Sequence, residues 1–287
     1  MKDPRSVCRR LVRWMSVSIF AVVVSVFVPQ AFAQVVLVSG NSLVSINPVG
    51  PNPGMNNWTV DGFNTLNLQW FWYRAGSMTS EQSIDTISAP TITPTSAHQS
   101  RIGYANNSYS VSVDYNLNGQ ALGSGLSTLF EVVSIRNLTS TTQTFTFFQY
   151  SDFNLGGPPG DSVLIGQDNR GMFGDALQTN GPIRLAESSV TPGANRAEAS
   201  IFPNTLNSLN DGAVTVLNNS TSAGPGNATW AFEWDITLTP FGTQGDTFGI
   251  SKTLDVVVPE PSAAALLTVG GVIGALVRRR KCQNNRA

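Results

Sequence analysis

Two acidic residues two positions apart, Glu233 and Asp235, are the clearest catalytic candidates in the sequence. On a β-strand this spacing turns both carboxylates to the same face. Glycosidases use two carboxyl groups about 5 to 9.5 Å apart on opposite sides of the scissile bond. A single strand does not supply that two-sided geometry. We therefore expect both carboxylates to lie on a solvated strand face, and a hydrolase is the alternative.

Aspartates also recur through the glycine-rich stretch 151–175. Three of them, Asp152, Asp161 and Asp168, are candidate Ca²⁺ ligands, because loops with several carboxylates and free carbonyls suit a hard cation. The stretch lacks the spacing of an EF-hand loop, and turn capping is the alternative role of these residues. No other cofactor and no other metal are expected.

Other catalytic chemistry finds little support between residues 34 and 258. His98 is the only histidine, no Gly-x-Ser-x-Gly sequence is present, and the two cysteines, Cys8 and Cys282, lie outside this range. A serine triad, a thiol nucleophile and a histidine- or cysteine-based metal site are therefore not expected. We expect a protein that is not an enzyme.

Aromatic residues cluster early in residues 34–258, the body of the chain, and they allow two interpretations. Trp58, Trp70, Trp72 and Tyr73 either pack in a hydrophobic core or form exposed platforms on which sugar rings stack. Exposure of two or more of them on one face would favour a carbohydrate-binding module, whereas burial of all four would count against it.

The elements that carry these residues are β-strands separated by Gly, Pro and Asn clusters. Strands are predicted at residues 35–38, 66–73, 109–115, 129–136, 142–150, 163–166, 184–188, 213–217, 229–239 and 248–258. The two-residue period is sharpest in 229–239, which predicts a half-buried antiparallel strand. A polar turn at 137–141 predicts a hairpin over 129–150, and 204–210 indicates a helical turn. The fold class is all-β, an antiparallel β-sandwich of jelly-roll type forming one domain over 34–258.

The charge of this domain differs from that of the whole chain. The chain has 17 basic and 18 acidic residues, but residues 34–258 keep 7 basic and 16 acidic ones, with Lys252 as the only lysine. Nucleic acids and anionic membranes attract clustered Lys and Arg. A nucleic-acid partner is therefore not expected for the body.

The remaining basic residues lie in two terminal segments. Residues 1–33 have a basic start, an apolar run at 15–28 and the small-x-small pattern of Ala31 and Ala33. This pattern is typical of a secretory signal peptide cleaved after Ala33 by signal peptidase. An uncleaved anchor is the alternative, although the run is shorter than the roughly 20 residues of a membrane span.

The C-terminal segment, residues 259–282, has three parts. Pro259, Glu260 and Pro261 precede an uncharged run at 262–277, which is followed by the basic cluster Arg278, Arg279, Arg280 and Lys281. The run predicts a short transmembrane helix, and the basic cluster places its end in the cytoplasm with the body outside. Prolines on both sides of Glu260 keep that segment extended and accessible. A simple tail anchor is the alternative.

This order of motif, helix and arginine cluster resembles the PEP-CTERM sorting signal. The resemblance implies that exosortase recognises Pro259, Glu260 and Pro261, that the protein is held briefly in the inner membrane, and that it then reaches the cell surface or extracellular matrix. On this interpretation the body is a non-catalytic structural or adhesive domain. A carbohydrate-binding module of the exopolysaccharide matrix is the alternative, with extracellular polysaccharide as its partner.

Overall fold

A computed structural model of the chain describes residues 34–156 and 160–259. The predictions for the signal peptide, for the C-terminal helix and for its basic cluster therefore fall outside the described residues. In the described part no helix is long and apolar enough to cross a membrane.

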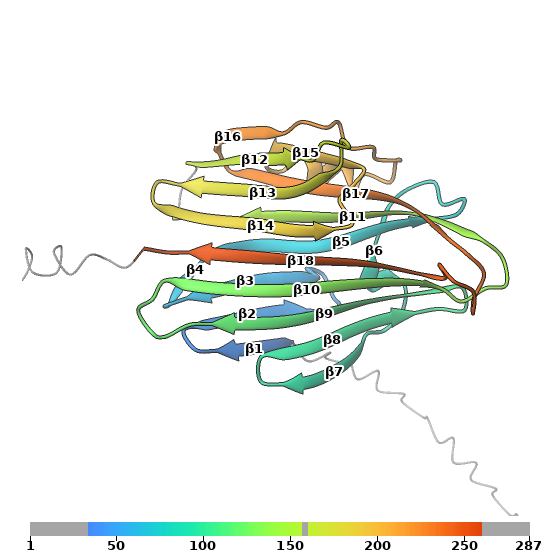
Figure 1. Ribbon diagram of the computed structural model, residues 1–287, viewed down its shortest axis with the longest axis horizontal. Helices are drawn as coiled ribbons and strands as arrows, with labels where there is room; N and C mark the ends of the chain where they lie inside the picture. Colours follow the sequence, from blue (N-terminus) through green and yellow to red (C-terminus); the bar gives the residue numbers. More distant parts are fainter. Residues whose placement is uncertain (1–33, 157–159, 260–287) are drawn as a thin grey trace, which may run out of the picture. The chain divides into compact units, whose positions relative to one another are not determined.

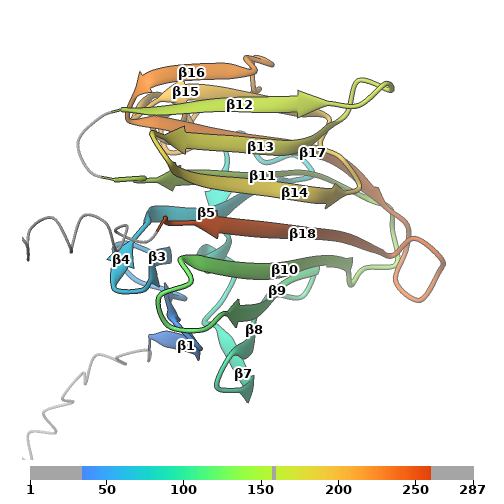
Figure 2. The ribbon, with the colours of Figure 1, turned by 60° about the vertical axis from the view of Figure 1, so that its left-hand side comes forward.

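The described chain forms two antiparallel sheets (Figures 1 and 2). Sheet A has the order β1 (Val35–Ser39), β2 (Ser42–Asn47), β3 (Gly54–Val60), β5 (Leu66–Ala75), β11 (Gln143–Phe153), β17 (Ala228–Leu238) and β15 (Arg196–Ile201), with β4 (Phe63–Asn64) on β3 and β6 (Gln82–Ser83) on β5. Sheet B has the order β16 (Ser222–Gly226), β12 (Asp161–Gln167), β13 (Phe173–Asn180), β14 (Ile183–Thr191), β18 (Thr247–Val257), β10 (Leu126–Asn137), β9 (Tyr109–Gly119), β8 (Gln99–Ala105) and β7 (Thr91–Ser96). Two short helices, η1 (Ile84–Thr86) and α1 (Asn204–Ser208), lie in the connections. The all-β class and the two antiparallel sheets are confirmed, and the jelly-roll type stays a prediction.

Two local predictions are wrong. The expected hairpin over 129–150 does not form, because β10 belongs to sheet B and β11 to sheet A. The buried Asn137 explains the change of sheet: its side chain donates to the carbonyl oxygens of Thr141 at 2.7 Å and Thr239 at 2.8 Å, which ties the turn to the end of β17. Residues 213–217 were expected to form a strand and have no regular structure.

The core between the sheets is aromatic and aliphatic. Phe71, Phe147 and Trp234 are buried in sheet A, with ring centroids 5.7 Å apart for Phe71 and Phe147. Alternate residues of β18, such as Ile250 and Leu254, face them from sheet B. Burying side chains of this size contributes about 1.5–3 kcal/mol each to the stability of the sandwich.

Three charged side chains and one amide lie inside this core, and we call them the interior cluster: Lys252, Glu131, Glu187 and Gln149. The Lys252 ammonium contacts the carboxylates of Glu131 at 2.6 Å and Glu187 at 3.4 Å, and all three side chains are fully buried. Lys252 also donates to Gln149 Oε1 at 2.6 Å, and Gln149 Nε2 donates to Glu187. Because these residues come from both sheets, the cluster ties the two layers together.

Candidate functional site

Sheet A also has a polar outer face, turned away from sheet B. In the register of the sheet, Thr146 on β11 lies between Arg74 on β5 and Asp235 on β17, and Arg196 on β15 lies beside Glu233. The two-residue period places these five side chains on the same side, opposite to Phe71 and Phe147. The predicted same-face placement of Glu233 and Asp235 is confirmed.

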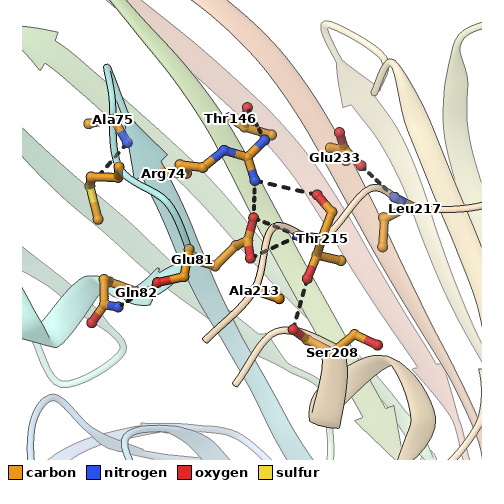
Figure 3. A network of polar contacts seen from close by, with 12 residues as sticks. Arg74, Ala75, Glu81, Gln82, Thr146, Ser208, Ala213, Thr215, Leu217 and Glu233 are labelled. Carbon is orange, nitrogen blue, oxygen red and sulfur yellow. Dashed lines mark hydrogen bonds and ion pairs between the residues drawn. The ribbon is translucent and has the colours of Figure 1, made fainter. Parts of the chain in front are cut away.

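Five charged residues on and over this face form what we call the outer cluster: Arg74, Glu81, Arg196, Glu233 and Asp235. Arg74 pairs with Glu81, whose side chain is fully buried, and donates to Thr146 Oγ1 at 3.1 Å (Figure 3). Arg196 bridges the other two carboxylates, at 3.1 Å from Glu233 and 3.0 Å from Asp235.

Residues 213–217, which we call the crossing segment, pass over the outer cluster. Both oxygens of Glu81 accept the backbone N–H of Thr215 at 3.1 Å, and Glu233 accepts that of Leu217 at 2.8 Å (Figure 3). Side-chain carboxylates thus take the place of a neighbouring strand. This explains why a segment with strand-like alternation is not a strand.

The environment of Glu233 differs from the solvated strand face that we expected. Its side chain is 1% exposed, whereas that of Asp235 is 50% exposed. Burial raises the pKa of Glu233 above its ordinary value, although the Leu217 N–H and the Arg196 charge act in the opposite direction. Since Arg196 holds both carboxylates and the crossing segment covers one of them, the pair does not flank an open cleft as a hydrolase would require.

A small cavity beside Asp235, the β17 cavity, has a volume of about 190 Å³. It is lined by Arg74, Gly76, Thr144, Phe145, Thr146, Asp235, Ile236 and Thr237. Small-molecule sites usually occupy about 300–1,000 Å³. The β17 cavity lies below that range, and its guanidinium already has partners in Glu81 and Thr146.

A second cavity on the same side of sheet A, the α1 cavity, has a volume of about 420 Å³. It is lined by Gly50, Pro51, Asn52, Pro53, Leu68, Trp72, Ser83, Asp85, Thr86, Leu206 and Asn210. Side chains that form hydrogen bonds alternate with apolar ones, and Asp85 is the only charged residue of the lining. A mainly apolar wall with a few placed polar groups is typical of small-molecule sites.

Two tryptophans of β5 hold the walls of the α1 cavity in place. Trp70 Nε1 donates to Ser83 Oγ at 2.8 Å, and the Ser83 hydroxyl in turn donates to the Asp85 carboxylate. Trp72 Nε1 donates to Asn210 Oδ1 at 3.2 Å. The indoles thus anchor the connections around η1 and α1 to the sheet, and they hold Asp85 and Asn210 in the lining of the cavity.

A cavity of about 510 Å³ beside Val258 and Pro259 suits a polar ligand less well. Its walls are mainly apolar, and its one carboxylate, Asp61, already accepts the backbone N–H groups of Gly123 at 2.7 Å and Gly125 at 2.8 Å. Those bonds lower the pKa of Asp61, with the Gly123 N–H as the main cause. The carboxylate therefore has a structural role in its loop.

The exposed aromatic platforms are absent, and the burial of all four side chains counts against a carbohydrate site on which sugar rings stack on them. Trp58, Trp70, Trp72 and Tyr73 are only 0–4% exposed. Trp72 lines the α1 cavity. Nothing local in the sequence marks the α1 cavity, because Asp85 and Asn210 are far apart in the chain and meet only through the connections over sheet A.

The three predicted Ca²⁺ ligands lie in different surroundings. Asp152 and Asp161 are buried, but Asp168 lies in the exposed β12–β13 turn, where it pairs with Arg170 at 2.9 Å. In residues 34–156 and 160–259 no group of three or more His, Cys, Asp or Glu side chains is arranged to hold a metal. His98 is exposed in the β7–β8 turn. Of the sorting motif only Pro259 is described, and it is exposed.

Comparison with known proteins adds structural likenesses only. No family model and no curated protein matches the sequence. Among solved structures, the chain is similar to a putative aldose 1-epimerase from Escherichia coli K12 (10% identity, 79% of this chain and 99% of that one, TM-score 0.47). It is also similar to a galactose mutarotase-like protein from Lactobacillus casei (7% identity, 78% and 100%, TM-score 0.49) and to a protein from Synechocystis (9% identity, 79% and 96%, TM-score 0.43).

These likenesses correct two expectations. The body was expected to be a structural or adhesive domain and not an enzyme, whereas the similar structures are described as an epimerase and a mutarotase-like protein. Both expectations are therefore withdrawn. At these TM-scores the likenesses assign no substrate, reaction or residue role to this chain, and its function has to be argued from its own cavities.

Proposed function

We propose that the domain binds a neutral carbohydrate in the α1 cavity. The observation that carries the proposal is the lining of this cavity, in which apolar surface from Leu68, Trp72 and Leu206 adjoins polar groups from Asn52, Asp85 and Asn210. A sugar ring presents both kinds of surface, with C–H groups that pack against apolar side chains and hydroxyls that need donors and acceptors.

The charge of the lining favours a neutral ligand. Asp85 is half-buried and no Lys or Arg lines the cavity, so an anionic sugar would meet a carboxylate without a compensating cation. A carboxylate accepts two hydroxyl hydrogens at once, and the amides of Asn52 and Asn210 can both donate and accept. The volume of about 420 Å³ lies within the range of small-molecule sites.

Binding measurements on the purified protein test this function. Titration calorimetry or ligand-observed NMR with a panel of neutral and acidic mono- and oligosaccharides should identify neutral ligands. Asp85→Asn should weaken their binding about tenfold or more, because charge-assisted hydrogen bonds contribute about 1.5–3 kcal/mol each. Asp85 does not sit in the hydrophobic core, so the variant is expected to fold.

Asp235→Asn is the matched control, since it changes a half-exposed carboxylate on sheet A that lies outside the α1 cavity. It should leave carbohydrate binding unchanged. Loss of binding in Asp235→Asn with retention in Asp85→Asn would move the site to the β17 cavity. Binding of acidic sugars alone would contradict the proposal.

The export and sorting signals stay predictions, and we propose them separately from the binding function. They fall on residues 1–33 and 259–282, nearly all outside the described residues. If exported, the domain would meet extracellular polysaccharide. Replacing Pro259, Glu260 and Pro261 with alanine should keep the protein in the inner membrane with its C-terminal segment uncut, and unchanged release and mature size in cell fractions would contradict the sorting signal.

A further inference from the structure

The interior cluster places an amine, a carboxamide and two carboxyl groups in contact between the two sheets. Lys252 Nζ lies 2.6 Å from Gln149 Oε1 and 2.6 Å from the Glu131 carboxylate. Gln149 Nε2 donates to both oxygens of Glu187, at 2.8 and 2.7 Å. An unprotonated lysine amine is a nucleophile toward carbonyl carbon. The cluster therefore contains the groups from which an amide bond between two side chains can form.

The amine of Lys252 is close to the carbon that it would attack. Because a C=O bond is about 1.23 Å long, a nitrogen 2.6 Å from Gln149 Oε1 lies within about 3.8 Å of Gln149 Cδ. Reacting atoms in near-attack geometries are about 3–3.5 Å apart. The attack thus needs only a rotation of the Lys252 side chain from the oxygen toward the face of the amide.

The surroundings exclude water and favour the unprotonated amine. The side chains of Lys252, Glu131 and Glu187 are fully buried, and so is Gln149. In such an environment a neutral pair, with the proton on Glu131 and a free amine on Lys252, avoids two desolvated charges. Burial raises the pKa of Glu131, in agreement with its role as the group that takes this proton.

We propose that Lys252 and Gln149 react to form an intramolecular isopeptide bond that joins β18 to β11. Glu131 takes one proton from the ammonium, and the Nζ lone pair then attacks Gln149 Cδ and forms the new C–N bond. Oε1 of Glu187 contacts both nitrogens, Nζ at 3.4 Å and Nε2 at 2.8 Å. It accepts a proton from Nζ and passes it to Nε2, after which the Cδ–Nε2 bond breaks and ammonia leaves.

The atoms and charges of this reaction balance without a co-reactant. One amine and one carboxamide become one secondary amide and one ammonia, Glu187 returns to its starting form, and Glu131 keeps the proton that it took. Residues 34–258 contain no cysteine, so the bond supplies a covalent link between the sheets that no disulfide of this domain could provide. The inference does not depend on a ligand in the α1 cavity.

Intact-mass spectrometry of the purified protein tests the proposal. The protein should weigh about 17 Da less than its sequence, which is the mass of one ammonia. A tryptic map should contain a branched peptide that joins Lys252 to Gln149 and is uncut after Lys252. Since Lys252 is the only lysine of residues 34–258, no other lysine of the domain can produce such a peptide. A folded protein that keeps its full mass after days of incubation would overturn the proposal.

Three variants separate this bond from another source of the same mass loss. An N-terminal glutamine also loses ammonia when it cyclises, and cleavage after Ala33 would expose Gln34. Gln34→Ser should therefore keep the loss, whereas Lys252→Met and Gln149→Met should abolish it. A loss that disappears in Gln34→Ser and persists in Lys252→Met would overturn the proposal. The peptide map of the unchanged protein decides the question even if a variant does not fold.

Glu187→Gln tests the proton transfer. An amide cannot relay the proton from Nζ to Nε2, so the bond should form at least about tenfold more slowly, at the low end of what general acid–base catalysis contributes. Asp235→Asn is the matched control, because it changes a carboxylate outside the interior cluster and should form the bond at the original rate. Equal rates in the two variants would overturn the proposed mechanism.

Discussion

The interior cluster and the outer cluster have the same imbalance of charge in different surroundings. Lys252 faces two carboxylates in the interior cluster, and Arg74 and Arg196 face three in the outer cluster. In the outer cluster the surplus charge lies on Asp235, which is half exposed and hydrated. In the interior cluster all three charged side chains are fully buried, so no group can be hydrated.

The difference shows how each cluster accommodates its surplus carboxylate. Burial raises the pKa of Glu131 in the interior cluster, against the opposing effects of Lys252 and Gln69, and the charge of Glu187 adds to the rise. Glu131 Oε1 also lacks a hydrogen-bond partner. Burial thus favours the protonated form of Glu131 in the interior cluster, whereas the outer cluster exposes its surplus carboxylate, Asp235, to water.

Removing the one cation of the interior cluster should produce the largest effect. Lys252→Met keeps the length of the side chain but leaves Glu131 and Glu187 buried without a positive charge. Breaking a buried ion pair in this way costs about 3–5 kcal/mol. Urea unfolding at neutral pH should show a loss of this size, and a loss below about 1 kcal/mol would mean that the interior cluster is already neutral without its lysine.

The Arg74 pair of the outer cluster should contribute less. Arg74 is 16% exposed on its side chain, and Glu81 keeps the Thr215 N–H when the arginine is replaced. Arg74→Met should therefore lower the free energy of unfolding by about 1.5–3 kcal/mol, the range for hydrogen bonds to charged groups. Hydrogen exchange at Thr215 should become faster, since the crossing segment also loses the bond from Arg74 to the Thr215 carbonyl. Unchanged exchange would show that Glu81 alone holds the segment.

The sequence predicted nine of the eighteen described strands, and it did not predict what covers them. The two-residue period of 229–239 correctly placed Trp230, Phe232 and Trp234 in the core. The same period predicted Glu233 as solvated, because it contains no information about a segment that crosses the face from elsewhere in the chain. The α1 cavity was missed for the same reason, since its walls meet only in three dimensions.

Lys252 illustrates a signal that was present in the sequence but was not used. It is the only lysine of residues 34–258. The two-residue period of the strand places it on the same face as Ile250, Leu254 and Val256. A lone cation on an apolar face indicates a buried partner of opposite charge. The identity of that partner could not be predicted, because Glu131 and Glu187 come from other strands of sheet B.

The raised pKa of Glu131 should make stability depend on pH. Its pKa is raised in the folded state, so the folded protein binds more protons than the unfolded chain above pH 4.3, and stability falls as the pH rises through the folded-state pKa. The slope of one such group is at most about 1.4 kcal/mol per pH unit. Lys252, Glu187 and Tyr115 are the titratable groups that face Glu131. Glu131→Gln should remove this part of the slope in unfolding titrations from pH 5 to 8, and an unchanged slope would show that Glu131 is ionised.

Asp235→Asn makes the equivalent change in the outer cluster and should have the smallest effect. It removes the surplus carboxylate, as Glu131→Gln does in the interior cluster, but from a side chain that is 50% exposed. Exposed ion pairs contribute about 0–1 kcal/mol, so the free energy of unfolding should change by no more than this. A larger loss would mean that Asp235 is needed to hold Arg196 over Glu233. The arrangement of the charges would then matter more than burial in determining which carboxylate of the cluster is exposed.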